Sequence, residues 1–356
     1  MTAVSNDHTQ RLQQAVARAL MAKTPLKITG GGSKAFYGRE ASGEPLCIDG
    51  HRGIVNYHPS ELVVTARAGM LLTELEQTLA EQGQMLAFEP PHFGEKATLG
   101  GAIACGFSGP RRPFAGSARD FVLGCKIING KAEVLSFGGE VFKNVAGFDV
   151  SRLMVGALGT LGVLLEISLK VLPRPDAEWT CRFELPIADA LAKMTTLASG
   201  PLPVSGLSYD GRELHVRLSG AEKAVKTAAT RIGGDAGAAD SAYWQELNEH
   251  QLDFFQVEMN VWRLSLPPAT KPLALAGDWV YDWGGGLRWL KTAEPAEAVF
   301  AAAEQAGAHA LLFKRQNRSG EVFHPLTGRL KQLNQHIKQA FDPYGLFNPQ
   351  RIYQDW

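Results

Sequence analysis

The 356-residue sequence lacks closely spaced cysteines, long apolar runs and a charge excess of either sign. Its four cysteines, Cys47, Cys105, Cys125 and Cys181, are far apart, unlike the short paired spacings of zinc and iron-sulfur sites. We therefore expect no cluster and no metal site in this chain. We interpret all four cysteines as small buried hydrophobic residues.

Charge and hydropathy exclude further classes. Lys+Arg and Asp+Glu are both 36, so no basic excess points to nucleic acid. No run of about 18 apolar residues predicts a membrane-spanning helix. The N-terminal segment has the period of an amphipathic helix from about Gln10 to Met21 and does not resemble a signal peptide. We expect a cytoplasmic protein, which partners could hold on the inner membrane.

Glycine, in contrast, is concentrated in one part of the chain. Residues 94–162 contain 14 glycines in 69 positions, against 38 in all 356. Apolar segments such as FVLGCKII and LGVLLEISLKVL separate them, so the region is not a flexible linker. Glycines of this kind allow positive φ or close backbone approach. The pattern favours a binding surface, with tight turns in a β-rich domain as the alternative.

Periodicity predicts an α+β chain in two parts. The first part has more strands than helices, with a helix at 70–84 that ends at Gly83. An apolar strand then runs into Pro173 and Pro175, a plausible domain boundary, and all seven tryptophans lie at or after Trp179. In the second part short strands alternate with helices, which predicts an antiparallel sheet covered by helices on one face.

Three segments carry binding chemistry. Gly30, Gly31 and Gly32 follow the strand LKIT and precede Ser33 and Lys34, so several backbone N–H groups can converge on a phosphate or pyrophosphate. Neither the dinucleotide fingerprint nor the P-loop spacing is present. A second glycine-rich loop, ATLGGAIACGFSG at 97–109, and a third segment, KNVAGFDVSRLMVGALGTLGVLLEI, imply a long, folded cofactor.

These segments, with EPPHFGEKATLGG, DWGGGLRWLK and the ending DPYGLFNP, resemble the FAD-binding subunits of bacterial glycolate oxidase, in the vanillyl-alcohol-oxidase or PCMH-type FAD-binding superfamily. The resemblance covers nearly the whole chain. It implies a PCMH-type FAD-binding domain of two α+β subdomains at 1–175 and an antiparallel-sheet α+β cap at 176–325. The C-terminal helix and tail at 326–356 would return to the FAD-binding domain.

The resemblance also implies which residues bind FAD. The first loop is similar to the pyrophosphate loop, the second to another FAD-contacting loop, and the third to a turn whose backbone meets the flavin or adenine. The positions carried over are Gly30, Gly31, Gly32, Ser33, Lys34, Thr98, Gly100, Gly101, Ser108, Gly109, Gly116, Arg119, Asp120, Gly159, Gly162 and Val163. The pyrophosphate turn has no His, Cys or Tyr, so we expect dissociable FAD; Cys105 is suggestive of a covalent link only by its location.

The implied activity is oxidation of glycolate to glyoxylate by a complex with a larger FAD-linked catalytic subunit and an iron-sulfur subunit. Related hydroxyacid dehydrogenases carry GDGNLH and GEHG strings that bind a metal and the substrate carboxylate, and neither string occurs here. We therefore expect this flavin to be structural or an electron relay. The alternatives are a self-sufficient glycolate or D-lactate dehydrogenase and a non-catalytic assembly subunit.

Catalytic residues are not identified by the sequence. Three weak candidates are His92, as a base, and Arg111 with Arg112, as a carboxylate clamp. The alternative interpretation of His92 is a loop histidine that hydrogen-bonds to the backbone. The alternative for Arg111 and Arg112 is an exposed pair on a loop. Lys143 and Asn144 lie in a motif that faces the cofactor in the family. We expect Arg288 to be exposed on a strand, with a place in the cap cavity as the alternative. His309 and His324 are isolated histidines.

Overall fold

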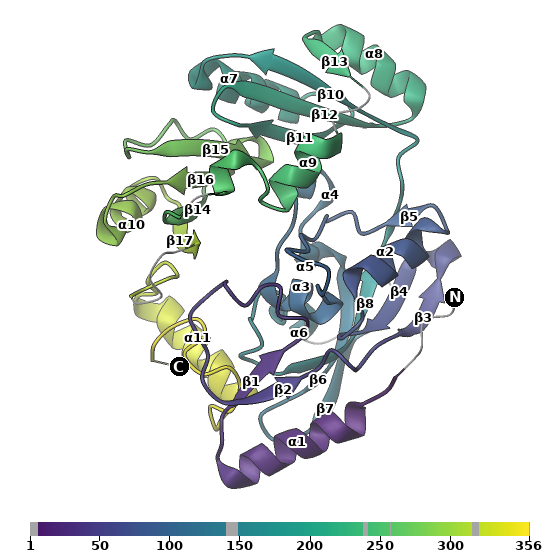
Figure 1. Ribbon diagram of the computed structural model, residues 1–356, viewed down its shortest axis with the longest axis vertical. Helices are drawn as coiled ribbons and strands as arrows, with labels where there is room; N and C mark the ends of the chain where they lie inside the picture. The colour runs from purple at the N-terminus through teal and green to yellow at the C-terminus, as the bar shows by residue number, and fades with distance from the viewer. Residues whose placement is uncertain (1–5, 140–148, 238–240, 257, 315–319, 356) are drawn as a thin grey trace. The chain divides into compact units, whose positions relative to one another are not determined.

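The computed structural model describes residues 6–139, 149–237, 241–256, 258–314 and 320–355. The chain forms two compact units (Figure 1). Unit 1 contains residues 1–108, 116–174 and 325–356, and unit 2 contains residues 109–115 and 175–324. Each unit combines antiparallel sheet with helices, so the α+β class expected from the sequence is confirmed.

Unit 1 contains a five-stranded antiparallel sheet in the order β3-β4-β8-β6-β7. Beside it stand a parallel pair, β1 with β2, and a short antiparallel pair, β5 with β9. The strands are β1 Leu26–Thr29, β2 Glu44–Cys47, β3 Ile54–His58, β4 Val63–Arg67, β5 Gln84–Met85, β6 Val122–Ile128, β7 Val134–Gly138, β8 Val163–Lys170 and β9 Leu172–Pro173.

The helices of unit 1 follow the expected apolar period. In α1, Leu12, Val16 and Ala19 recur on the buried face. The expected helix at 70–84 is α2, which is shorter and buries Leu72, Leu75 and Leu79. The helices are α1 Thr9–Ala22, η1 Pro59–Glu61, α2 Leu72–Ala80, α3 Leu99–Cys105, α5 Ala118–Phe121, α6 Val150–Leu153 and α11 Gly328–Phe341.

Unit 2 is built on one eight-stranded sheet in the order β13-β10-β12-β11-β15-β16-β14-β17, and every registered pair is antiparallel. The strands are β10 Ala177–Glu184, β11 Val204–Tyr209, β12 Glu213–Gly220, β13 Asp235–Gly237, β14 Val261–Ser265, β15 Asp278–Asp282, β16 Leu287–Lys291 and β17 His309–Lys314. The helices are α4 Arg112–Ala115, α7 Ile187–Ala198, α8 Glu222–Ile232, α9 Ser241–Asn248, η2 Asp253–Phe255, η3 Trp283–Gly285 and α10 Ala296–Gln305.

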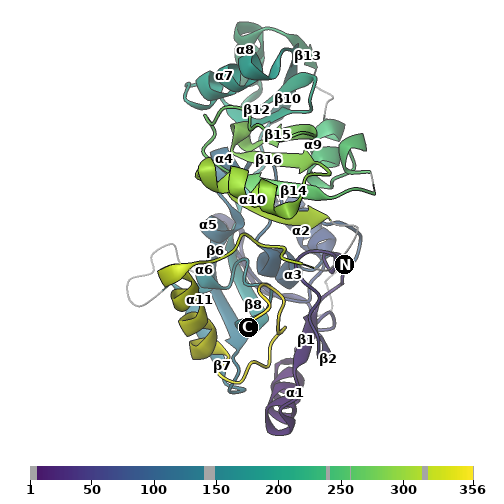
Figure 2. The same ribbon diagram turned by 90° about the vertical axis from the view of Figure 1, so that its left-hand side faces the viewer.

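Helices cover both faces of this sheet, so the expectation of a single covered face is wrong. α7 and α8 lie on the same side of β10 and β12 (Figure 2), where Cys181 of β10 joins their apolar cluster. The neighbouring Thr180 points to the opposite face because side chains alternate along a strand. There its Oγ1 accepts a hydrogen bond from Trp244 Nε1 of α9 at 2.9 Å. Helix α9 was not predicted from the sequence.

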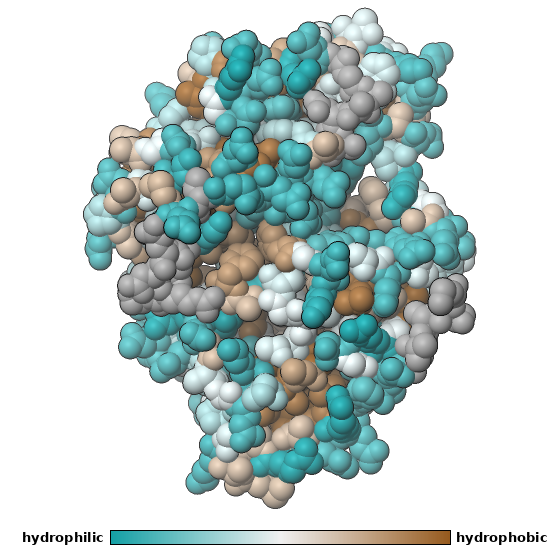
Figure 3. Space-filling model, viewed as in Figure 1, coloured by the Kyte–Doolittle hydropathy of each residue, from teal (hydrophilic) through white to brown (hydrophobic). Residues whose placement is uncertain are grey.

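Most of the visible surface of each unit is polar (Figure 3), and the apolar side chains form the cores. Among the described residues, none of the helices is long and apolar enough to cross a membrane. The interpretation of the cysteines as buried holds for Cys125 and Cys181. It is wrong for Cys47, which is exposed on the short pair β1–β2, and Cys105 is intermediate.

Candidate functional site

The first glycine loop follows β1 and packs against the second. An added Cβ at Gly31 would overlap the carbonyl oxygen of Lys96, and one at Gly30 would overlap Thr98 Oγ1. Gly31 is therefore required because the backbones of the two loops touch, and Gly30 is required because its backbone lies against the Thr98 side chain. The structure brings together two segments that are about 70 residues apart in the sequence.

Gly32 has a different environment. Its φ is +76°, and an added Cβ would meet nothing within 4 Å. Among the described residues, the backbone N–H groups of Gly31, Gly32 and Ser33 have no hydrogen-bond acceptor. Unpartnered N–H groups on a glycine turn form a concave site for an anion. This loop therefore fits a phosphate or pyrophosphate group.

Lys34 places a positive charge beside the same turn. Its side chain is buried, and Nζ donates to the carbonyl oxygen of His92 at 3.0 Å and lies 3.4 Å from Ser33 Oγ. The ammonium group also lies 5.6 Å from the ring centroid of Phe93. A buried ammonium held this way strengthens the attraction of the turn for a phosphate.

The second loop begins α3. Thr98 is its N-cap, and Thr98 Oγ1 accepts from the backbone N–H of Gly101 at 3.2 Å. An added Cβ at Gly100 would lie 2.7 Å from Ala68 Cβ, so Gly100 lets α3 pack closely on the chain after β4. An added Cβ at Gly101 would meet only Thr98 Oγ1, at 3.1 Å. Gly101 is therefore the less confined of the two.

The third segment docks on the end of α3. The backbone N–H of Gly156 donates to Ile103 and that of Leu158 to Ala104, at 3.0 and 2.8 Å. Gly159, with φ +69°, follows directly, and an added Cβ there would lie 2.7 Å from Asn348 Nδ2. The three predicted segments therefore meet within unit 1.

Asn348 was missed as a member of this site. Its Nδ2 donates to the carbonyl oxygen of Leu158 and its Oδ1 accepts from the backbone N–H of Ile28, both at 2.7 Å. The C-terminal tail thus runs back to β1, where Phe347 pairs with Leu26 (Figure 1). The string DPYGLFNP carried the signal for this segment, but not its contacts.

The end of the third segment is part of the sheet. Gly162 precedes β8, and an added Cβ would lie 2.9 Å from the carbonyl oxygen of Ile128 on β6. Val163 pairs with Ile128, and its side chain is completely buried. A completely buried residue offers no exposed atom to a ligand, so Val163 supports the turn from within the sheet.

The residues between the second and third segments form a capped turn. Ser108 Oγ accepts from the backbone N–H of Ala118 at 2.9 Å, at the start of α5. Asp120 Oδ2 accepts from the backbone N–H and the hydroxyl of Ser117, both at 2.8 Å, which completes a capping box. Gly116 has φ +113°, and Arg119 and Asp120 are exposed.

Aromatic rings that sequence reasoning missed line the same loops. Phe107 lies 4.5 Å from Tyr37 and 5.9 Å from Phe93 between ring centroids.

The Cys105 thiol at the end of α3 is not ionised. Burial raises the pKa of this thiol to about 11, against an opposite effect of Lys34 and Arg351. Cys105 is therefore a protonated thiol at neutral pH, which is a poor nucleophile.

Two catalytic candidates have structural partners in unit 2. Arg111 is buried and forms an ion pair with Glu178, and Arg112 stacks over Trp283 at 4.1 Å. The Nε1 of Trp283 also donates to the carbonyl oxygen of Gly109 at 3.0 Å. The interpretation of this arginine pair as an exposed loop pair is wrong, because residues 109–115 pack within unit 2.

Other candidates are also paired. His92 Nε2 lies 3.0 Å from Glu76 Oε2 in unit 1. Arg288 is completely buried, donating to the carbonyl oxygens of Gly285, Lys271 and Thr270, so its expected exposure on a strand is wrong. The rings of His309 and His324 lie 5.3 Å apart. Lys143 and Asn144 fall outside the described residues.

Comparison with known proteins gives the class. A family model described as "FAD binding domain" matches residues 3–138. A solved alkyldihydroxyacetonephosphate synthase has the same fold, with a TM-score of 0.67 and 17% identity over 96% of this chain and 75% of that one. A D-lactate dehydrogenase from Anaerostipes hadrus is 37% identical over 123 residues, which are 34% of this chain and 25% of that protein. The class is that of FAD-dependent oxidoreductases.

A fuller match gives the family. Glycolate oxidase subunit GlcE of Escherichia coli K12 is 48% identical over 349 residues, 98% of each chain. The chain therefore belongs to the family of glycolate oxidase subunit GlcE. FAD is its cofactor, which agrees with the unpartnered N–H groups of the Gly31–Ser33 turn.

Proposed function

We propose that this chain is the FAD-binding subunit of a complex that oxidises glycolate to glyoxylate. The end-to-end match to a glycolate oxidase subunit carries the proposal, supported by the anion-binding turn that follows β1. When bound, FAD supplies a two-electron acceptor for a hydroxyl-bearing carbon. We further propose that unit 1 corresponds to the FAD-binding domain and unit 2 to the cap.

Unit 1 would hold the cofactor mainly through main-chain atoms. The turn from Gly31 to Ser33 would bind the pyrophosphate through N–H groups, with Lys34 adding positive charge. Gly101, less confined than Gly100, would let the second loop approach the cofactor, and the Gly159 turn would offer backbone atoms to a ring edge. The remaining predicted positions of unit 1 would support the same loops, whereas Gly109 belongs to unit 2. Binding would be non-covalent, because the pyrophosphate turn contains no His, Cys or Tyr and the Cys105 thiol is protonated.

The flavin would be structural or relay electrons, with the substrate oxidised elsewhere in the complex. The side chains that the sequence offered as base or clamp are engaged: His92 with Glu76, Arg111 with Glu178, and Arg112 with the ring of Trp283. Freeing Arg111 would leave Glu178 without this partner, which is costly for a partly buried carboxylate. These contacts favour a relay over a self-sufficient dehydrogenase.

The proposed partners are a larger FAD-linked catalytic subunit and an iron-sulfur subunit. The word "subunit" in the name of the Escherichia coli relative motivates a heteromeric assembly. An iron-sulfur partner would accept single electrons from the reduced flavin. We place the complex in the cytoplasm, held peripherally on the inner membrane through partners.

Co-expression with candidate partners tests this assignment. The isolated chain is expected to bind FAD but to show no glycolate-dependent dye reduction, which would appear when the catalytic subunit is added. An Arg111→Lys variant serves as a matched probe of the clamp. If it changed the KM for glycolate in the complex without changing FAD content, Arg111 would contact substrate and the relay proposal would fail.

A further inference from the structure

Asp210 lies at the turn of the β11–β12 hairpin in unit 2, where hydrogen bonds hold its carboxylate in place. Asp210 Oδ1 accepts from the backbone N–H groups of Arg212 and Glu213, at 2.9 and 2.7 Å. These bonds fix the carboxylate at the turn, as aspartate commonly does. They leave Oδ2 for other partners, and the Asp210 side chain is 30% exposed.

A buried imidazole faces that second oxygen. His215 of β12 is 4% exposed, and its Nε2 lies 3.1 Å from Asp210 Oδ2. The ring stacks on Tyr243 of α9, with the centroids 3.6 Å apart and the planes 10° from parallel. The stacking holds the ring in one orientation, so the direction of Nε2 is set before any ligand arrives.

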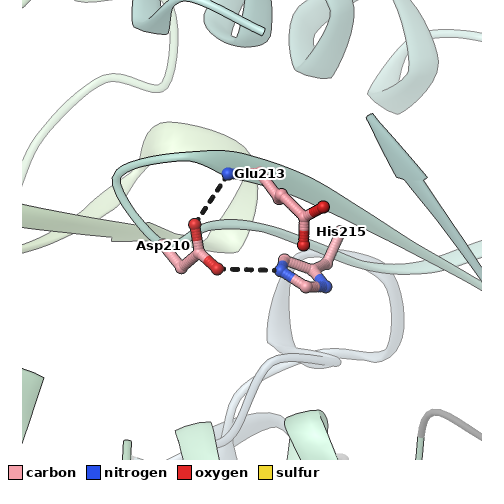
Figure 4. Close-up of side chains that lie close together, drawn as sticks. All are labelled: Asp210, Glu213 and His215. Atoms are coloured by element: carbon pink, nitrogen blue, oxygen red, sulfur yellow. Dashed lines mark hydrogen bonds and ion pairs between the residues drawn. The ribbon is translucent and has the colours of Figure 1, made fainter. Parts of the chain in front are cut away.

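The carboxylate of Glu213 is a third possible metal ligand at the same place. One ligand atom from each of Asp210, Glu213 and His215 lies within 4.8 Å of the other two, and the side chains converge (Figure 4). Among the described residues, no hydrogen bond or ion pair engages the Glu213 carboxylate, and the adjacent Arg212 pairs with Glu184. Two carboxylates at this separation repel each other unless a cation lies between them.

The surrounding charges do not supply that cation. On the neighbouring strand β10, Arg182 stands opposite His215 and Glu184 opposite Glu213, so this strand adds one charge of each sign. The two carboxylates of the hairpin therefore keep an excess of negative charge.

The donor set and its spacing match one class of ion. Zinc bonds of about 2.0–2.2 Å to nitrogen and carboxylate oxygen place tetrahedral ligand atoms roughly 3.4 Å apart. The pair formed by His215 and Asp210 is already near that spacing. Glu213 is partly exposed, so its side chain can rotate inward, and the exposed side of the cluster leaves a fourth position for water. An imidazole with two carboxylates suits a first-row transition cation better than Mg²⁺ or Ca²⁺.

We propose that Asp210, Glu213 and His215 bind one divalent transition-metal cation of the Zn²⁺ type, which fastens the β11–β12 hairpin. The site is separate from the FAD loops of unit 1 and does not depend on the proposed function. The sequence-based expectation of no metal site rested on cysteine spacing and on the absence of the GDGNLH and GEHG strings. A site of one histidine and two carboxylates on a hairpin leaves no such signature.

Zinc titration of the purified full chain, stripped of metals by a chelator, tests the proposal by calorimetry. One saturable site is expected, with binding weakened at least about tenfold in Glu213→Gln, which keeps the shape of the side chain. Asp210→Asn should weaken binding similarly, because it removes a carboxylate from the site. The turn should stay intact in this variant, because the amide oxygen can still accept from the two turn N–H groups. Circular dichroism checks that both variants fold.

Two control variants distinguish this site from other side chains that could bind zinc. His309→Gln removes a histidine that lies near His324, and Glu184→Gln removes a neighbouring carboxylate. Neither should change the affinity, and Mg²⁺ at the same concentration should not compete. The proposal is overturned if wild type shows no saturable zinc binding. Equal affinity and stoichiometry in Glu213→Gln would also overturn it, leaving the Asp210–His215 bond as a brace of the hairpin.

Discussion

Lys338 Nζ lies 2.6 Å from Asp342 Oδ2, one turn apart at the end of α11, and both side chains are buried. The ammonium group also donates to the carbonyl oxygens of Thr160 and Phe347 at 2.8 and 3.2 Å. Asp342 in turn accepts from the backbone N–H groups of Leu346 and Phe347. This ion pair joins the C-terminal tail to the turn that precedes β8.

Replacing Lys338 with methionine should destabilise unit 1 strongly. Asp342 would be left as a buried charge without its cation, a change that typically costs about 3–5 kcal/mol. The midpoint of guanidinium chloride unfolding measures the loss. Lys331→Met is the matched control, because its ion pair with Asp355 is roughly half exposed and such pairs contribute about 0–1 kcal/mol. Equal effects of the two variants would contradict the role given to Lys338.

Gly32→Val should reduce FAD binding while unit 1 stays folded. The residue has positive φ and open space, so valine strains the turn and covers its N–H groups without displacing a neighbour. Flavin absorbance per chain after gel filtration measures the effect. Gly307→Val is the control, because Gly307 has φ +65°, equally open space, and a place in unit 2. Full flavin content in Gly32→Val would remove this turn from the FAD site.

Gly31→Val should have a harsher effect than Gly32→Val. A Cβ at Gly31 would overlap the carbonyl oxygen of Lys96, so the two loops must separate and unit 1 loses stability as well as flavin. Thermal unfolding of the two variants with excess FAD distinguishes a loss of stability in unit 1 from a loss of FAD binding alone. A Gly31→Val variant that melts like Gly32→Val would show that the loops can part without cost.

Asn348→Ala should loosen the third segment from β1. The side chain bridges the partly buried backbone N–H of Ile28 and the buried carbonyl oxygen of Leu158, and its removal leaves both groups without that partner. Each unsatisfied group costs about 1–3 kcal/mol, so the two groups together are expected to cost roughly 2–6 kcal/mol. Thermal unfolding and FAD affinity should fall together. A stable variant with unchanged flavin affinity would contradict this placement of the tail.

The buried His51 should make the chain sensitive to mild acid. Burial lowers the pKa of His51 from 6.5 to about 4, and its Nδ1 accepts from the backbone N–H of His8. Its contribution to stability is complete above pH 6.5 and falls as the pH drops toward 4, because the unfolded chain binds a proton that the folded chain excludes. The expected loss between pH 7 and pH 5 is on the order of 2 kcal/mol.

His51→Asn tests this pH dependence, since its amide oxygen can still accept from the His8 N–H. Urea unfolding at pH 7 and pH 5 should show a smaller loss in the variant than in wild type. His250, whose pKa burial lowers to about 3, contributes equally to both proteins and cancels in the comparison. An unchanged loss at pH 5 would assign the acid sensitivity to other groups.

The sequence predicted helices and strands well where the pattern of nearby residues determines them. The apolar period of α1 and the strand before Gly30 both depend on residues a few positions apart. It predicted contacts poorly where they join distant residues. Nothing near Gly31 reveals that Lys96 lies against it, and nothing near Arg111 reveals Glu178. A glycine that faces a ligand and one that faces another loop look alike in the sequence.

The most direct test of the central claim is the visible spectrum of the purified chain under anaerobic conditions, before and after glycolate is added. The account predicts an FAD spectrum that glycolate alone does not bleach, and bleaching when the catalytic subunit is present. A chain without flavin after gentle purification would contradict the assignment of FAD to unit 1. Rapid bleaching of the isolated chain by glycolate would contradict the relay role.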